Sequence, residues 1–90
     1  SIQEKATLQK EVLNFEPHLA LFSDPDPLAF YKSIITNAKQ LLKPGGLLFF
    51  ETHETYGSLL PELPEFEGYS DIQLKQDFYG KQRFLKARFN

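Results

Sequence analysis

The sequence predicts an α/β fold, and three stretches of the chain support this prediction. The first is a helix from Pro27 to Leu42, in which apolar residues recur at intervals of three and four. The second is the run Leu-Leu-Phe-Phe at 47–50, which is closed by Glu51. An uninterrupted apolar run of this length is typical of a strand that is covered on both faces in a parallel sheet. The third is the C-terminal stretch, where apolar and polar residues alternate as in an antiparallel β-hairpin.

The N-terminal segment predicts a short helix around Ala6–Leu13. Leu8, Val12 and Leu13 follow a roughly helical spacing, and several residues between them are good helix formers. A helix of this length is marginal on its own, so we expect it to pack on the rest of the chain.

A loop region separates this segment from the central helix. Pro17 favours an extended backbone at Glu16, and residues 19–22 are all apolar. We therefore expect residues 14–22 to form either an extended loop that docks into the core or a short strand. Residues 23–27 contain two prolines and several turn-forming residues, which predicts a loop.

The central helix carries start and stop signals at its two ends. Asp26 or Asp24 is placed to cap its N-terminus, and the proline after Asp26 suits the first helical position. At the other end, Pro44 cannot continue a helix. Gly45 and Gly46 then supply a positive-φ turn that leads into the apolar strand.

The region after Glu51 predicts a short or irregular helix. Leu59, Leu60 and Leu63 would anchor it, while Pro61 and Pro64 would interrupt it within a turn or two.

Residues 65–70 are expected to form a connector that leads into the hairpin. Ile72 and Leu74 lie on its first strand, and Leu85, Ala87 and Phe89 lie on its second. The turn is expected within residues 77–82.

The composition is that of a small globular protein. Ninety residues make at most one small domain, and a formal net charge of −2 argues against a nucleic-acid-binding protein held mainly by phosphate contacts. The chain contains no cysteine, which excludes disulfides, thiolate zinc sites and a cysteine nucleophile within it. No apolar run reaches the roughly 20 residues of a membrane helix, so we expect a soluble protein with no membrane partner.

The candidate functional residues follow the apolar strand directly. Glu51, Thr52 and His53 come at its carboxyl end, which is where ligands bind in open α/β sheets. The alternative is that Glu51 simply ends the strand in solvent. His18 and His53 are the only histidines and show no metal-ligand spacing, so no metal site is predicted. By chemistry alone, the sequence contains no self-contained active site.

Three motifs together resemble one enzyme family. They are E-K-A-T-L-x-x-E-V-L-N-F-E-P-H-L-A-L-F at 4–22, D-P-L-A-F-Y-K-x-I at 26–34, and L-K-P-G-G-L-L-F-F-E at 42–51. They resemble the C-terminal portion of the protein-(glutamine-N5) methyltransferases that modify peptide chain release factors. The resemblance continues to D-F-Y-G-K-Q-R-F at 77–84, and its most specific part is the F-E-P motif at 15–17 together with A-L at 20–21.

This resemblance implies a Rossmann-like class I methyltransferase sheet of seven strands, the last two of which form an antiparallel hairpin. It also implies S-adenosylmethionine as methyl donor, the glutamine of a release factor's Gly-Gly-Gln motif as acceptor, and a cytoplasmic location. In the family, a glycine-rich loop after the first strand holds the donor, and an Asn-Pro-Pro-Tyr motif after the fourth holds the acceptor amide. Neither motif occurs in this sequence.

The resemblance therefore assigns no catalytic residue to this chain. Residues 1–90 are expected to form a single partial domain that lacks the cofactor-binding half, with the catalytic residues upstream of Ser1. Glu16 and Pro17 match the family's Glu-Pro, and Glu51 matches the carboxylate that ends its fifth strand. The resemblance places these three residues close to the substrate or the cofactor.

Two alternatives remain open from the sequence. One is a free-standing α/β interaction module without activity, which would form a homodimer through exposed strand edges. The other is a different class I methyltransferase that acts on another amide or amine.

Overall fold

The computed structural model describes residues 9–15, 26–53, 55–76 and 83–90. In chain order its elements are β1 (Lys10–Phe15), α2 (Pro27–Leu41), β2 (Leu42–Thr52), the 3₁₀ helices η2 (Gly57–Glu62) and η3 (Pro64–Phe66), β3 (Tyr69–Gln76) and β4 (Arg83–Phe89). This order confirms the predicted α/β class, with a helix followed by a strand and then by a hairpin.

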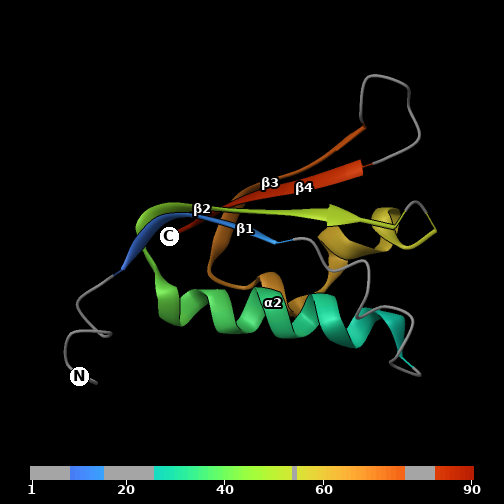
Figure 1. The fold of residues 1–90 in the computed structure, drawn as a ribbon, viewed down its shortest axis with the longest axis horizontal. Coiled ribbons are helices and arrows are strands. Elements are labelled where there is room, and N and C mark those ends of the chain that lie inside the picture. The colour runs from blue at the N-terminus through green and yellow to red at the C-terminus, as the bar shows by residue number, and fades with distance from the viewer. Residues whose placement is uncertain (1–8, 16–25, 54, 77–82) are drawn as a thin grey trace.

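The four strands form one mixed sheet in the order β1-β2-β4-β3 (Figure 1). The strand β1 pairs with β2 in parallel, whereas β2 with β4 and β4 with β3 are antiparallel. Both edges of β2 are therefore paired within this chain, and β1 and β3 form the edges of the sheet. The predicted C-terminal hairpin is confirmed as β3 and β4, while its expected turn at 77–82 lies outside the described residues.

The helix α2 begins and ends close to the predicted positions. Asp26 is its N-cap, and its Oδ1 accepts a hydrogen bond from the Leu28 N–H at 3.0 Å, which satisfies one of the free amides of the first turn. The helix ends at Leu41, one residue earlier than predicted. Leu42 is at once its C-cap and the first residue of β2.

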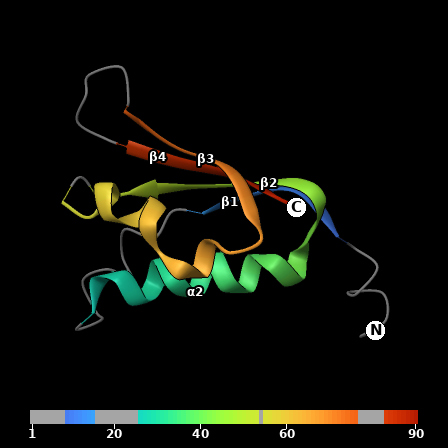
Figure 2. The same ribbon diagram turned by 180° about the vertical axis from the view of Figure 1, so that it is seen from behind.

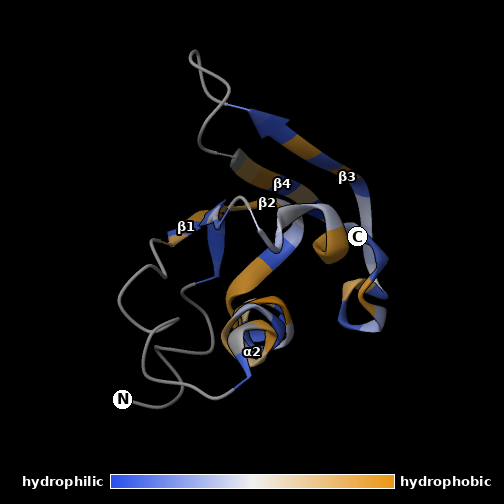
Figure 3. Cartoon of the chain, turned by 90° about the vertical axis from the view of Figure 1, so that its right-hand side faces the viewer, coloured by the Kyte–Doolittle hydropathy of each residue, from blue (hydrophilic) through white to orange (hydrophobic). Residues whose placement is uncertain are grey.

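The core lies between α2 and one face of the sheet (Figures 1 and 2). Figure 3 looks along α2 and shows it under β1 and β2, with the 3₁₀ segments on the same side of the sheet. The helix and the two central strands supply most of the buried side chains. They are Tyr31, Ile34, Ile35, Ala38, Leu42, Leu48, Phe50, Leu85 and Ala87, joined by Leu60, Phe66 and Tyr69.

The other face of the sheet, which we call the open face, has no described helix against it (Figures 2 and 3). Burial along β2 alternates because successive side chains point to opposite faces. Leu48 and Phe50 are fully buried against α2, whereas Leu47 and Phe49 on the open face are only half-buried. The prediction that residues 47–50 are covered on both faces is therefore wrong for the described part of this chain.

The predicted N-terminal helix is also wrong where the structure describes it. Lys10–Phe15 form a strand, and Leu13 packs against the core together with Phe15. Val12, which points the other way, is 53% exposed. Helix propensity is a weak preference, and pairing with the backbone edge of β2 satisfies more main-chain groups than an isolated helical turn would. Residues 1–8 and 16–25 lie outside the described residues.

The Pro-Gly-Gly joint shows that the two glycines have different roles. Gly45 has φ +84°, as predicted, which a side chain rarely tolerates. Gly46 does not have a positive φ. A Cβ there would lie 2.9 Å from the Lys43 carbonyl oxygen and 3.1 Å from that of Lys10. The expected positive φ at Gly46 is thus wrong, and this glycine is required instead by the close approach of atoms from both β2 and β1.

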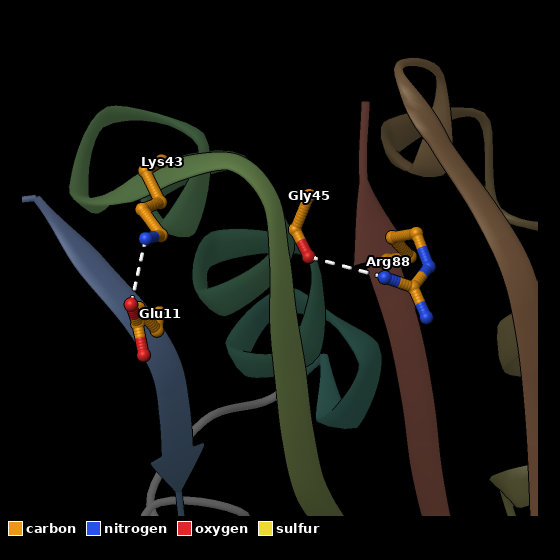
Figure 4. A network of polar contacts seen from close by, with 4 residues as sticks. All are labelled: Glu11, Lys43, Gly45 and Arg88. Carbon is orange, nitrogen blue, oxygen red and sulfur yellow. Dashed lines mark hydrogen bonds and ion pairs between the residues drawn. The ribbon is translucent and has the colours of Figure 1, made fainter.

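Polar contacts connect the start of β2, at Lys43 and Gly45, to the strands on both sides of it (Figure 4). Lys43 Nζ lies 2.7 Å from Glu11 Oε1 on β1, and this hydrogen bond lowers the pKa of the Glu11 carboxyl. From β4, Arg88 donates to the Gly45 carbonyl oxygen at 3.3 Å. The irregular start of β2 is therefore connected to both of its neighbouring strands.

The segment after β2 confirms the predicted irregular helix. It consists of two 3₁₀ helices, the first with Pro61 inside it and the second beginning at Pro64. The expected connector at 65–70 is shorter than predicted, because Phe66 belongs to η3 and Tyr69 already begins β3. Among the residues that the structure describes, no helix is long and apolar enough to cross a membrane.

Candidate functional site at the carboxyl ends of β1 and β2

The carboxyl ends of β1 and β2 lie at the same edge of the sheet because the two strands are parallel. Phe15, the last residue of β1, pairs with Phe50 near the end of β2. In open α/β sheets this edge is the usual place for a ligand. Of the predicted site residues, Glu16 and Pro17 follow Phe15 in sequence but lie outside the described residues. Of the three residues that the resemblance places near the substrate or cofactor, the structure therefore describes only Glu51, together with the candidates Thr52 and His53 that follow it.

Glu51 lies within β2, on the open face, and is half-buried. The strand continues to Thr52, so Glu51 does not simply end it in solvent. Thr52 points the opposite way and is buried, with 7% of its surface exposed. The side chains of these two polar residues at the end of β2 thus lie on opposite faces of the sheet.

Glu51 lines a shallow pocket of about 310 Å³ on the open face. The other lining residues come from all four strands and are Asn14, Phe49, Lys75, Phe84 and Lys86. Two phenyl rings, one carboxylate, one amide and two ammonium groups give the pocket an apolar surface with polar groups around it. Such a surface suits an amphipathic partner better than a small ion.

His53 is held in place from two directions at the end of β2. Its backbone N–H donates to the Tyr31 hydroxyl oxygen at 2.8 Å. Its Nδ1 accepts a hydrogen bond from the Thr55 N–H at 3.1 Å, and its ring packs on Tyr56 with centroids 5.4 Å apart. Because Nδ1 accepts a hydrogen bond from the backbone, Nε2 of the exposed imidazole is the ring nitrogen left for a contact with a ligand.

Tyr31 is the residue of this site that sequence reasoning missed. It lies on α2, is fully buried, and packs on Phe50 with ring centroids 5.6 Å apart. Burial raises the pKa of its hydroxyl, which stays neutral at physiological pH. Its position in the apolar stripe of α2 gave no sign that its hydroxyl would anchor the end of β2.

The described residues contain no group of acidic, histidine or cysteine side chains that could hold a metal ion. The described residues also contain no glycine-rich loop of the kind that the resemblance implies for holding S-adenosylmethionine. A cofactor loop is rich in glycine, follows a strand and opens a helix. Gly45 and Gly46 follow α2, Gly68 precedes β3, and the described segment from β2 into η2 offers only the single Gly57. The glycine-rich loop that the resemblance implies is therefore not among the described residues.

A parallel helix-linked strand pair that continues into an antiparallel hairpin is the arrangement of the C-terminal region of a methyltransferase α/β sheet. The comparisons with known proteins agree with this class. The chain is similar to a C-terminal portion of proteins named release factor glutamine methyltransferase, which confirms the resemblance found in its sequence.

Three relatives document this correspondence, each named as a release factor glutamine methyltransferase. The Bacteroides thetaiotaomicron protein is 42% identical over 85 residues, which are 93% of this chain and 31% of the relative. The Flavobacterium psychrophilum protein is 41% identical over 87 residues, 96% of this chain and 30% of the relative. The Synechocystis protein is 38% identical over 87 residues, 96% of this chain and 29% of the relative.

The chain thus spans about three tenths of the length of these curated relatives. No family model matches the chain. No solved structure matches it. The comparisons give no support to the alternative of a free-standing interaction module.

Proposed function

We propose that the chain is the C-terminal segment of an S-adenosylmethionine-dependent methyltransferase. The complete enzyme would transfer a methyl group to N5 of the glutamine in the Gly-Gly-Gln motif of peptide chain release factors. The observation that carries this proposal is the 42% identity to the Bacteroides thetaiotaomicron release factor glutamine methyltransferase over 93% of the chain. The expected location is the cytoplasm, where release factors act in translation termination.

In this proposal the chain contributes support and positioning. An amide nitrogen is a poor nucleophile, so an enzyme that methylates it must hold the amide in line with the methyl donor and accept its hydrogen bonds. Glu16, Pro17 and Glu51 are proposed to lie near the bound substrate or cofactor. His53, held by Tyr31 and Thr55, adds a fixed donor at the same edge. The catalytic residues themselves are expected upstream of Ser1.

These ninety residues are not proposed to carry out the methyl transfer by themselves. S-adenosylmethionine supplies the methyl group in the complete enzyme, but its binding loop is absent from this sequence. We therefore expect the chain alone to transfer no methyl group and to bind the donor weakly at best. Micromolar binding of S-adenosylmethionine to the isolated chain, measured by calorimetry, would contradict this part of the proposal.

A chimera tests the proposed activity. The 85 matched residues of the Bacteroides thetaiotaomicron enzyme are replaced by those of this chain, and transfer of labelled methyl groups to a purified release factor is measured. We expect methylation of the release factor and none of a variant in which the Gly-Gly-Gln glutamine is replaced by alanine. The enzyme with the matched segment deleted serves as the inactive reference.

Absence of methyl transfer by a folded chimera would contradict the proposal. A chimera that is folded by circular dichroism and binds S-adenosylmethionine, yet leaves the release factor unmodified, shows that this segment belongs to an enzyme with another acceptor. Testing the same chimera on other protein amides and amines then addresses the remaining alternative.

A further inference from the structure

His53 has an exposed side chain on a main chain that is fixed from both sides. Its N–H donates to the hydroxyl oxygen of the buried Tyr31 at 2.8 Å, which connects it to α2. Its carbonyl oxygen accepts the N–H of Tyr56 at 3.0 Å and that of Gly57 at 2.9 Å, which connects it to the start of η2. The carboxyl end of β2 is thus anchored at His53 to the elements on either side of it in the chain.

The imidazole ring of His53 is held as well. Its Nδ1 accepts the Thr55 N–H at 3.1 Å, and the ring packs on Tyr56 with centroids 5.4 Å apart. An exposed side chain that moves freely loses conformational entropy when it contacts a ligand. Because this ring is already held in the free protein, a contact made by it loses less entropy.

The hydrogen bond from Thr55 also determines where the ring carries its proton. A ring nitrogen that accepts a hydrogen bond is unprotonated, so the neutral imidazole has its proton on Nε2. No described residue accepts a hydrogen bond from this Nε2–H. His53 therefore offers one positioned hydrogen-bond donor to a ligand.

The nearby carboxylate limits the kind of ligand that this donor suits. Glu51 lies two residues before His53, and two residues of extended chain span about 7 Å. Charges at this separation still interact at physiological ionic strength, so the Glu51 carboxylate disfavours an anionic ligand beside His53. A neutral carbonyl oxygen accepts the same hydrogen bond without this repulsion. Both residues lie at the carboxyl edge of the parallel strands, where ligands bind in open α/β sheets.

We propose that His53 binds the protein substrate of the complete enzyme, and that its Nε2–H donates a hydrogen bond to an amide carbonyl oxygen of that substrate. This rests on the proposed function, because the release factor supplies the amide. The carbonyl belongs to the main chain beside the acceptor glutamine or to the glutamine side chain, and the two share this chemistry. In both cases the bond helps to orient the acceptor amide for transfer.

Two variants of the chimera described above separate the ligand contact from support of the turn. His53→Asn keeps the turn, because an asparagine side-chain oxygen accepts the N–H two residues further on as Nδ1 does, but it has no group in the place of Nε2. His53→Gln places an amide N–H₂ near the position of Nε2 instead. Circular dichroism checks that both variants are folded.

We expect His53→Asn to raise the Kd and the KM for the release factor about fivefold, as the loss of one neutral hydrogen bond predicts. The melting temperature and the affinity for S-adenosylmethionine should not change. His53→Gln should bind the release factor more tightly than His53→Asn does. Calorimetry and transfer of labelled methyl groups measure these values.

The release factor in which the Gly-Gly-Gln glutamine is replaced by alanine shows which carbonyl is bound. If His53→Asn weakens binding of this release factor by the same factor, the carbonyl belongs to the main chain. If His53→Asn has no effect on its binding, the carbonyl belongs to the glutamine side chain.

Three results would overturn the assignment of His53. They are an unchanged Kd for the release factor in His53→Asn, weaker binding of S-adenosylmethionine in its place, and His53→Gln binding the release factor no better than His53→Asn. A chimera that methylates the release factor but is insensitive to these changes contradicts the role of His53 alone. A chimera that does not methylate it contradicts the proposed function, and the role of His53 fails with it.

Discussion

Two buried tyrosine hydroxyls make specific hydrogen bonds at successive turns of α2. Tyr31 accepts the His53 N–H and fixes the carboxyl end of β2 against the helix. Tyr69, at the start of β3, donates to the Ile35 carbonyl oxygen at 2.7 Å. Each bond links residues far apart in sequence. The Tyr69 bond is buried and the Tyr31 bond is partly buried, and leaving a buried polar group without a partner is costly. These two side chains therefore help to fix the position of α2 on the sheet.

Because the Tyr69 hydroxyl is buried, we expect the free energy of unfolding to fall at alkaline pH. Burial raises the pKa of its hydroxyl from 10.0 to about 12. The folded state thus holds the phenolic proton more tightly than the unfolded state. This contribution is fully present below pH 10 and is lost as pH rises toward 12. We expect the free energy of unfolding to fall by on the order of 2 kcal/mol over this interval, as urea titrations at several pH values would measure.

The variant Tyr69→Phe isolates this effect. It should be less stable at neutral pH because the hydrogen bond to Ile35 is lost, and its stability should fall less steeply with rising pH. Tyr56→Phe, a half-buried tyrosine, is the matched control and should keep the wild-type slope. Part of the slope should persist in both variants, because burial also raises the pKa of Tyr31. Equal slopes in the wild type and Tyr69→Phe would show that Tyr69 ionises as freely in the folded state as in the unfolded state.

At the scale of elements, the joint between α2 and β2 predicts different outcomes for its two glycines. Gly45→Ala places a side chain at φ +84° with no atom within 4 Å of the new Cβ, so the cost is backbone strain of about 1–2 kcal/mol. Gly46→Ala pushes against the carbonyl oxygens of Lys43 and Lys10. We therefore expect Gly46→Ala to be the more destabilising change and to loosen β1 in particular.

Urea unfolding and amide hydrogen exchange measure the two effects separately. Gly46→Ala should accelerate exchange of the β1 amides, whereas Gly45→Ala should lower global stability without selecting β1. Gly45→Asn is a useful control, since asparagine tolerates a left-handed backbone better than alanine does. If both alanine variants accelerate amide exchange in β1 equally, the close approach at Gly46 does not hold β1 in its place beside β2.

The elements also show what the sequence could and could not predict. Helix α2, the apolar strand and the hairpin followed from periodicity and from caps, because each contains its own signal within a few residues. The strand β1 did not, because its conformation is decided by an edge of β2 more than thirty residues away. Position along β2 identified Glu51 as a candidate, but only the register with β4 showed that it shares a pocket with Phe84 and Lys86.

At the scale of the whole molecule, the sheet order predicts a gradient of protection. The strands β2 and β4 lie in the middle of the sheet and contribute the fully buried Leu48, Phe50 and Leu85. The strand β1 lies at an edge and none of its residues is buried. We expect amide exchange to be slowest in β2 and β4 and fastest in β1, because local opening of an edge strand exposes little apolar surface. Uniform exchange across the sheet would instead indicate that it opens only as a unit.

The direct passage from α2 into β2 restricts how the length of this protein can vary. Leu42 ends the helix and begins the strand, and its N–H still donates to the Ala38 carbonyl oxygen, so the connection contains no spare residue. One residue inserted or deleted at the start of the regular pairing, next to Leu47, would reverse the direction of the side chains that follow it in β2. Phe49 and Glu51 would then point into the helix, and Phe50 would point to solvent. Homologous proteins should therefore accumulate insertions and deletions elsewhere and keep this joint at constant length.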